Sequence, residues 1–130
     1  MGVLGIAMST AASQLLGFAW YGPLFGSMWC RNSGRRREDI ERSSKSKWIM
    51  VVPLLSKLGS SIIIAHLLKD HIGVKTVYDA CRNGLAFSAV IVLYNASHSP
   101  FQGEGLPAYL INAGYDAICT VMTAALVTRY

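Results

Sequence analysis

The chain has 130 residues, of which 52% are hydrophobic and 15% are charged, and its formal net charge is +5. The charged fraction is below the roughly 25% that is typical of soluble domains, and the length allows a single domain. No Asp, Glu, Lys or Arg occurs in residues 1–30 or 83–103. Because a soluble helix needs a polar face, this distribution argues against a water-soluble bundle.

Four apolar stretches predict four membrane-spanning helices, at about residues 3–21, 48–68, 77–96 and 107–128. Stretches of about 20 residues match the ~30 Å hydrocarbon core at a rise of ~1.5 Å per residue. We therefore expect one all-α domain over residues 1–130. It would be an integral membrane protein with its four transmembrane helices in an antiparallel bundle.

The first predicted helix carries a small residue at every fourth position. In lipid, such a stripe lets two helix backbones approach closely. Gln14 lies beside it and is expected to face protein, because an unpaired amide in hydrocarbon is costly. The stripe consists of Gly5, Ser9, Ser13 and Gly17.

Aromatic residues, glycines and one proline follow where this helix is expected to end. Trp and Tyr prefer the headgroup layer of a membrane, and Pro stops a helix. The segment is therefore predicted to lie at the membrane interface. Its residues are Trp20, Tyr21, Pro23, Phe25, Gly26 and Trp29.

A basic loop is predicted over residues 30–47, and it holds seven of the twelve Lys and Arg residues. This bias favours a cytoplasmic or matrix location for the loop, with both chain termini on the opposite side. Arg35, Arg36 and Arg37 are expected to contact anionic lipid headgroups. No aromatic residues are interleaved to stack on bases, so we expect no nucleic-acid partner. The pattern leaves open an organellar inner membrane or a plasma membrane.

Two charges of opposite sign are predicted to lie deep in the membrane. Lys57 follows Trp48 by nine residues, and Asp116 follows Pro107 by nine. Since an isolated charge at the bilayer centre costs ~3 kcal/mol, we expect the two to form an ion pair inside the bundle. Such a pair would fix which helix faces which, or it would form part of a path for protons or small solutes. Ser60, Ser61 and Asn112 are the expected further hydrogen-bond partners.

The third predicted helix repeats the small-residue stripe with Ala80, Gly84 and Ser88. His66 and Asp70 are four residues apart at an exposed interface, where solvated side chains are the more common case. The three cysteines have no metal-binding spacing. We therefore predict neither a metal nor a cofactor.

Catalytic signatures are absent from the sequence. It contains no G-x-S-x-G, H-E-x-x-H or P-loop motif and no paired carboxylates. We therefore expect no enzymatic activity.

Two segments resemble a known family. Residues 16–29 are similar to the signature G-x-x-W-Y-s-P-x-F-G-x-x-W of the domain-of-unknown-function family 1761 (DUF1761), and residues 110–115 are similar to its I-N-x-G-Y segment. Gly22 stands where the family often has Ser, and the loop is more basic than expected. The resemblance implies a small four-helix integral membrane protein and no established chemistry.

Two functions remain open from the sequence. The first is a structural or accessory (supernumerary) subunit of a larger membrane complex, whose partners are the lipid bilayer and other membrane protein subunits. The small-residue stripes would then face other chains. The alternative is passage of protons or a small solute through the bundle, which would place a hydrated cavity around Lys57 and Asp116.

Overall fold

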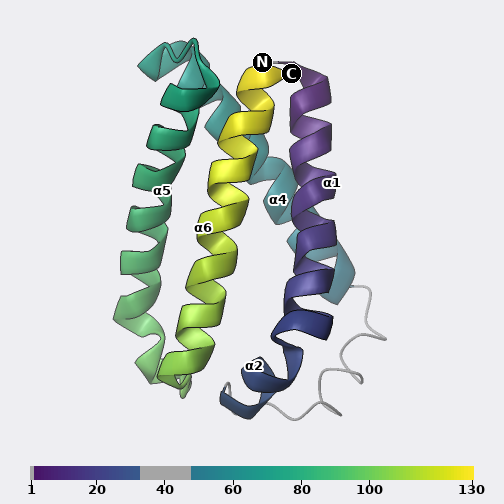
Figure 1. The fold of residues 1–130 in the computed structure, drawn as a ribbon, viewed down its shortest axis with the longest axis vertical. Helices are drawn as coiled ribbons and strands as arrows, with labels where there is room; N and C mark the ends of the chain where they lie inside the picture. The colour runs from purple at the N-terminus through teal and green to yellow at the C-terminus, as the bar shows by residue number, and fades with distance from the viewer. Residues whose placement is uncertain (1, 33–47) are drawn as a thin grey trace.

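The computed structural model describes residues 2–32 and 48–130, and every regular element in these two ranges is helical (Figure 1). Within residues 2–32 and 48–130, five α-helices are joined or extended by short π-helical and 3-10 turns. In chain order they are α1 (Val3–Ala19), the π-helical η1 (Trp20–Leu24), α2 (Gly26–Asn32), α4 (Trp48–His66), the π-helical η2 (Leu67–Ile72), α5 (Val77–His98), the 3-10 turn η3 (Pro100–Gln102) and α6 (Leu106–Arg129). The all-α class is confirmed.

The first helix passes through Pro23 instead of stopping at Tyr21. Pro23 has no N–H group, and the backbone widens into the π-helical turn η1, where the Phe25 N–H donates to the Trp20 carbonyl at 2.9 Å. Pro23 therefore ends the regular α-helical ladder without ending the helix. The short helix α2, which the sequence analysis did not predict, follows directly.

The second helix is also longer than expected. It continues from α4 through η2 to Ile72 and ends at Gly73, whose φ of 74° is the left-handed conformation that glycine adopts most easily. The Val74 N–H then donates to the Leu68 carbonyl at 2.8 Å. Two residues after Val74, the Thr76 hydroxyl caps α5 by accepting from the Asp79 N–H at 3.1 Å.

Helix α6 is the centre of the fold. It lies between α1 and α5 and contacts α1, α2, α4 and α5 (Figure 1). Its buried residues are Ala108, Ile111, Tyr115, Cys119, Thr120, Thr123, Ala124 and Val127. The end of α6 meets the start of α1, so the two ends of the chain lie side by side.

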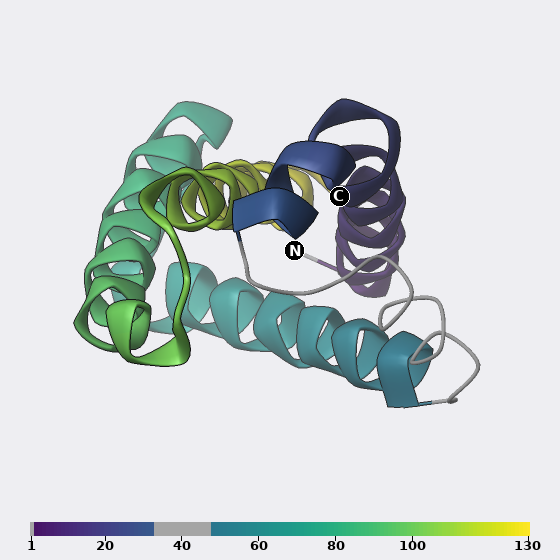
Figure 2. The ribbon, with the colours of Figure 1, turned by 90° about the horizontal axis from the view of Figure 1, so that it is seen from below.

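Helix α4 departs from a simple antiparallel bundle. In the end-on view of Figure 2 it runs across the page, oblique to α1 and α6. Its outer face carries a series of exposed aliphatic side chains, from Val51 to Ile63. An aliphatic face of this kind fits a helix that lies against lipid.

Both small-residue stripes pack inside the chain. A Cβ atom on Gly5 would lie 2.8 Å from the Leu126 carbonyl oxygen, and one on Gly84 would lie 3.0 Å from the Val121 Cα. Ser9 donates its hydroxyl proton to the Ser61 hydroxyl of α4 at 2.9 Å. The stripes therefore bring α1 and α5 close to α6, and α1 close to α4, as small residues do in lipid.

In the part of the chain that the structure describes, three helices are long and apolar enough to cross a membrane, namely Val3–Leu24, Val51–Ile72 and Leu106–Arg129. Helix α5 is less apolar than these three helices, because it carries polar side chains near both ends, such as Arg82 and Asn95, and it is not among the candidate spans. The predicted membrane character is thus supported by three helices instead of four.

Candidate functional site

The aromatic segment after α1 is joined to the first half of α6. The Trp20 indole Nε1 donates to the Ile111 carbonyl at 2.9 Å. Its ring lies against Gly114, where a Cβ atom would come within 3.1 Å of the indole. Trp20 therefore packs and hydrogen-bonds within the protein, and a headgroup location alone does not explain it.

Tyr21 extends this junction. Its hydroxyl donates to the Asn112 Oδ1 at 2.5 Å, and its ring meets the Tyr115 ring edge-on at a centroid distance of 5.3 Å. The Tyr115 hydroxyl donates to the Ser13 carbonyl at 2.9 Å and lies 2.9 Å from where a Cβ on Gly17 would be. Gly17 is thus the residue of the first stripe that makes room for this tyrosine.

A polar chain continues from Asn112 to the α5–α6 turn. The Asn112 amide donates to one carboxylate oxygen of Glu104, and the Ser99 hydroxyl donates to the other. The Gly105 N–H, at the start of α6, donates to the Asn32 carbonyl at 2.8 Å. These bonds tie η1 and α2 to the turn between α5 and α6.

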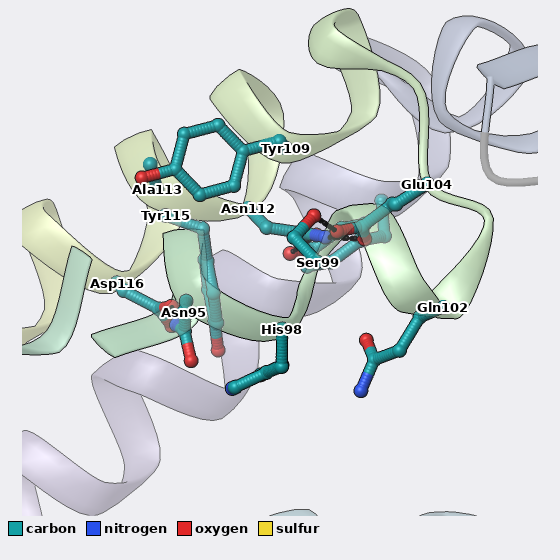
Figure 3. A pocket seen from close by; sticks show the side chains of 11 residues that line it. Asn95, His98, Ser99, Gln102, Glu104, Tyr109, Asn112, Ala113, Tyr115 and Asp116 are labelled. Atoms are coloured by element: carbon teal, nitrogen blue, oxygen red, sulfur yellow. Dashed lines mark hydrogen bonds between the residues drawn. The ribbon is translucent and has the colours of Figure 1, made fainter. Parts of the chain in front are cut away.

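A half-open cavity of about 260 Å³ lies beside this chain (Figure 3). Figure 3 shows Ser99, Glu104 and Asn112 converging on one side, with Asn95 next to Asp116 on the other. The Asn95 amide donates to the Asp116 Oδ2 at 3.3 Å. The cavity is lined by Tyr21, Asn95, His98, Ser99, Gln102, Glu104, Tyr109, Asn112, Ala113, Tyr115 and Asp116.

The family model described as "Protein of unknown function (DUF1761)" matches residues 4–128. The chain belongs to the DUF1761 family. The resemblance seen in the two sequence motifs is thus confirmed. Neither a curated protein nor a solved structure matches the chain.

The two DUF1761 motifs are far apart in sequence and meet at the cavity. Trp20 and Tyr21 of the first motif contact Ile111, Asn112 and Gly114 of the second through the bonds given above. Gly22 has no atom within 4 Å of a Cβ position, so the serine that is common in DUF1761 would fit there without a clash.

Lys57 and Asp116 of the DUF1761 chain are neighbours without direct contact. The Lys57 ammonium lies 4.6 Å from the centroid of the Tyr115 ring, and the carboxylate of Asp116 takes its hydrogen bond from Asn95. Among the described residues, the basic and acidic side chains within 4.0 Å of each other are those of His66 and Asp70, whose Nδ1 and Oδ2 atoms are 2.6 Å apart. In place of the expected direct Lys57–Asp116 pair, Lys57 makes a cation–π contact with the ring of Tyr115, the residue next to Asp116 in the sequence.

Of the expected supporting residues, Ser61 and Asn112 have other partners and Ser60 is exposed. Ser61 is buried against Ser9, and Asn112 joins Tyr21 to Glu104. Gln14 is half-buried, as a residue beside the packing stripe should be. Arg35, Arg36 and Arg37 lie outside the described residues.

Sequence reasoning missed Asn95 and Glu104 as parts of the site. Both lie near the α5–α6 turn, Asn95 in the last turns of α5 and Glu104 just before α6. One signal was available: Asn95, Asn112 and Asp116 are polar residues within otherwise apolar helices, and α5 and α6 are joined by a short turn. Antiparallel neighbours bring such residues together.

Proposed function

We propose that the protein crosses the membrane four times and takes a small polar solute into the cavity from the membrane face on which the α5–α6 turn lies. The observation that carries this proposal is the half-open cavity, which reaches Asp116 in the middle of a candidate membrane span. A cavity with a few convergent polar groups is the usual form of a small-molecule site.

Helix α5 supports four crossings because it accompanies α6 along its length. Gly84 meets Val121, and the Tyr109 hydroxyl donates to the Val92 carbonyl at 2.8 Å. Its 22 residues extend about 33 Å at ~1.5 Å per residue. Its polar residues near the two ends would then lie in the headgroup layers, and its apolar middle would lie in the hydrocarbon core.

The orientation rests on the basic segment between α2 and α4. The positive-inside bias supports a cytoplasmic or matrix location for that side, and with it for the mouth of the cavity. The chain termini, which lie at the other end of the molecule in Figure 1, would face the opposite compartment. The accessory-subunit hypothesis stays a prediction: the stripes that were expected to face other chains pack within this one.

Cysteine accessibility tests the cavity. In a background with Cys30→Ser, Cys81→Ser and Cys119→Ala, we expect Ala113→Cys to react with a charged, membrane-impermeant methanethiosulfonate added to one face of sealed membrane vesicles. Ala113 lines the cavity. The measurement is the rate of modification, followed by mass spectrometry.

The matched control is Ile118→Cys, on the same helix. Ile118 is 44% exposed and does not line the cavity. If lipid covers this face, the control stays unmodified by the charged reagent, despite its exposure. Equal reaction at both positions would contradict a membrane location, and no reaction at position 113 from either face would contradict a hydrated cavity.

A further inference from the structure

The charges at the cavity favour a cationic ligand. Two carboxylates, Asp116 and Glu104, line it, and no Lys or Arg within residues 2–32 and 48–130 does. Glu104 has both oxygens engaged by Ser99 and Asn112. Asp116 receives one long side-chain hydrogen bond, from Asn95. Since an ionised carboxylate accepts about four hydrogen bonds, Asp116 retains acceptor capacity at the cavity.

The aromatic wall favours an ammonium group in particular. Tyr21, Tyr109 and Tyr115 line the cavity, and the ring of Tyr115 already holds the ammonium of Lys57 at 4.6 Å. An ammonium beside an aromatic ring and a carboxylate gains from both the ring quadrupole and the opposite charge. The contact with Lys57 therefore shows that the ring of Tyr115 accommodates a primary ammonium group.

The cavity volume limits the ligand to a small molecule. About 260 Å³ is just below the 300–1,000 Å³ of drug-sized sites and far above the ~30 Å³ occupied by one water. A ligand with a short carbon chain fits this space better than a bare proton or a large metabolite.

We propose that the solute is a small organic primary ammonium ion that binds Asp116 beside the tyrosine rings, and that Lys57 is a tethered cation that weakens its binding. This inference rests on the proposed function, because it assigns the ligand class of the same cavity. Lys57 reaches the Tyr115 ring from α4 and does not line the cavity. Its charge repels a second cation at Asp116, so that Lys57 sets how tightly the site binds.

The test measures protection of Ala113→Cys in the purified full chain, in lipid nanodiscs, against the small neutral reagent methyl methanethiosulfonate. Propylammonium is the probe, and 1-propanol, propionate and K⁺ are the comparisons. We expect propylammonium alone to slow the modification, with saturation. Equal protection by propanol, propionate or K⁺ would overturn the ligand class.

Variants separate the two parts of the inference. Lys57→Met should lower the half-protecting concentration of propylammonium about tenfold, whereas Lys69→Met, at an exposed lysine outside the cavity, should not change it. Asp116→Asn should raise it at least about tenfold. Weaker binding in Lys57→Met would overturn the role of Lys57. If Asp116→Asn does not fold, the comparison of probes still tests the ligand class, and Lys57→Met still tests the role of Lys57.

The outcome also distinguishes this inference from the proposed function. An Ala113→Cys thiol that reacts but is not protected by propylammonium contradicts the ammonium ligand alone. A thiol that does not react from either membrane face contradicts the cavity itself, and with it both proposals.

Discussion

Single glycines set how closely the backbone segments approach in this protein. Gly26 begins α2 directly after the π-helical turn, and a Cβ there would lie 2.6 Å from the Tyr21 carbonyl oxygen. Because that contact is with backbone, a side chain at this position forces η1 and α2 apart. The same movement would disturb the hydrogen bond from Tyr21 to Asn112.

We expect Gly26→Ala to lower the free energy of unfolding by about 1–3 kcal/mol, the range for overpacked sites. The matched control is Gly22→Ala, four residues earlier, where no atom lies within 4 Å of the Cβ position. That change should stay within about 1 kcal/mol of the parent protein. Thermal unfolding in detergent micelles, followed by circular dichroism, measures both, and equal stability of the two variants would contradict the crowding at Gly26.

The sequence predicted which apolar helices carry polar side chains, but it did not predict which of these side chains contact each other. Lys57 and Asp116 were placed at matching depth by counting along the chain, and in the structure Lys57 lies over the ring of Tyr115, the residue before Asp116. Counting does not give the rotation of each helix about its axis or the oblique path of α4. Those two features put the ring of Tyr115 against Lys57 and the amide of Asn95 against Asp116.

At the scale of elements, α6 is the partner on which α1 and α5 depend. Gly5 of α1 packs on the backbone of α6 at Leu126 and Val127, where a Cβ would come within 2.9 Å of both. This contact needs the absence of a side chain and gains little from hydrophobic burial, since lipid is as apolar as the helix surface.

We expect Gly5→Ala to separate the two helices and lower stability by about 1–3 kcal/mol. Gly59→Ala in α4 is its control, because nothing lies within 4 Å of that Cβ position. The control should unfold at the same denaturant concentration as the parent protein or a higher one, since alanine favours the helix. Unfolding by sodium dodecyl sulfate in mixed micelles measures both variants. A Gly5→Ala protein as stable as its control would show that the α1–α6 contact is looser than described.

The sequence predicted the existence of the four long helices well, and their ends less well. Apolar length marked each helix within a few residues. The proline at position 23 suggested an end that the π-helical turn avoids, and α2 has too few residues to show a periodic pattern. The sequence also did not predict which helix packs against each small-residue stripe, because small residues indicate close packing but do not identify the neighbouring helix.

At the scale of the whole molecule, the number of crossings decides on which side each turn lies. If α5 crosses the membrane, Lys75 before it and Phe101 after it face opposite compartments. Both are exposed, Phe101 at 89%.

We expect single cysteines at these two positions, Lys75→Cys and Phe101→Cys, to react with an impermeant maleimide from opposite faces of oriented vesicles. The background lacks the three native cysteines, so only the introduced thiol is scored. Position 75 should share its side with the chain termini. Labelling of both positions from the same face would mean three crossings, with α5 lying on the membrane surface.

The central place of α6 has a consequence for biosynthesis. The ribosome makes α1, α4 and α5 before α6, yet α6 supplies the surface on which α1 and α5 pack. Until translation delivers it, Gly5 of α1 and Gly84 of α5 lack the α6 backbone on which they pack. Assembly of this protein is therefore a late event that the fourth long helix completes.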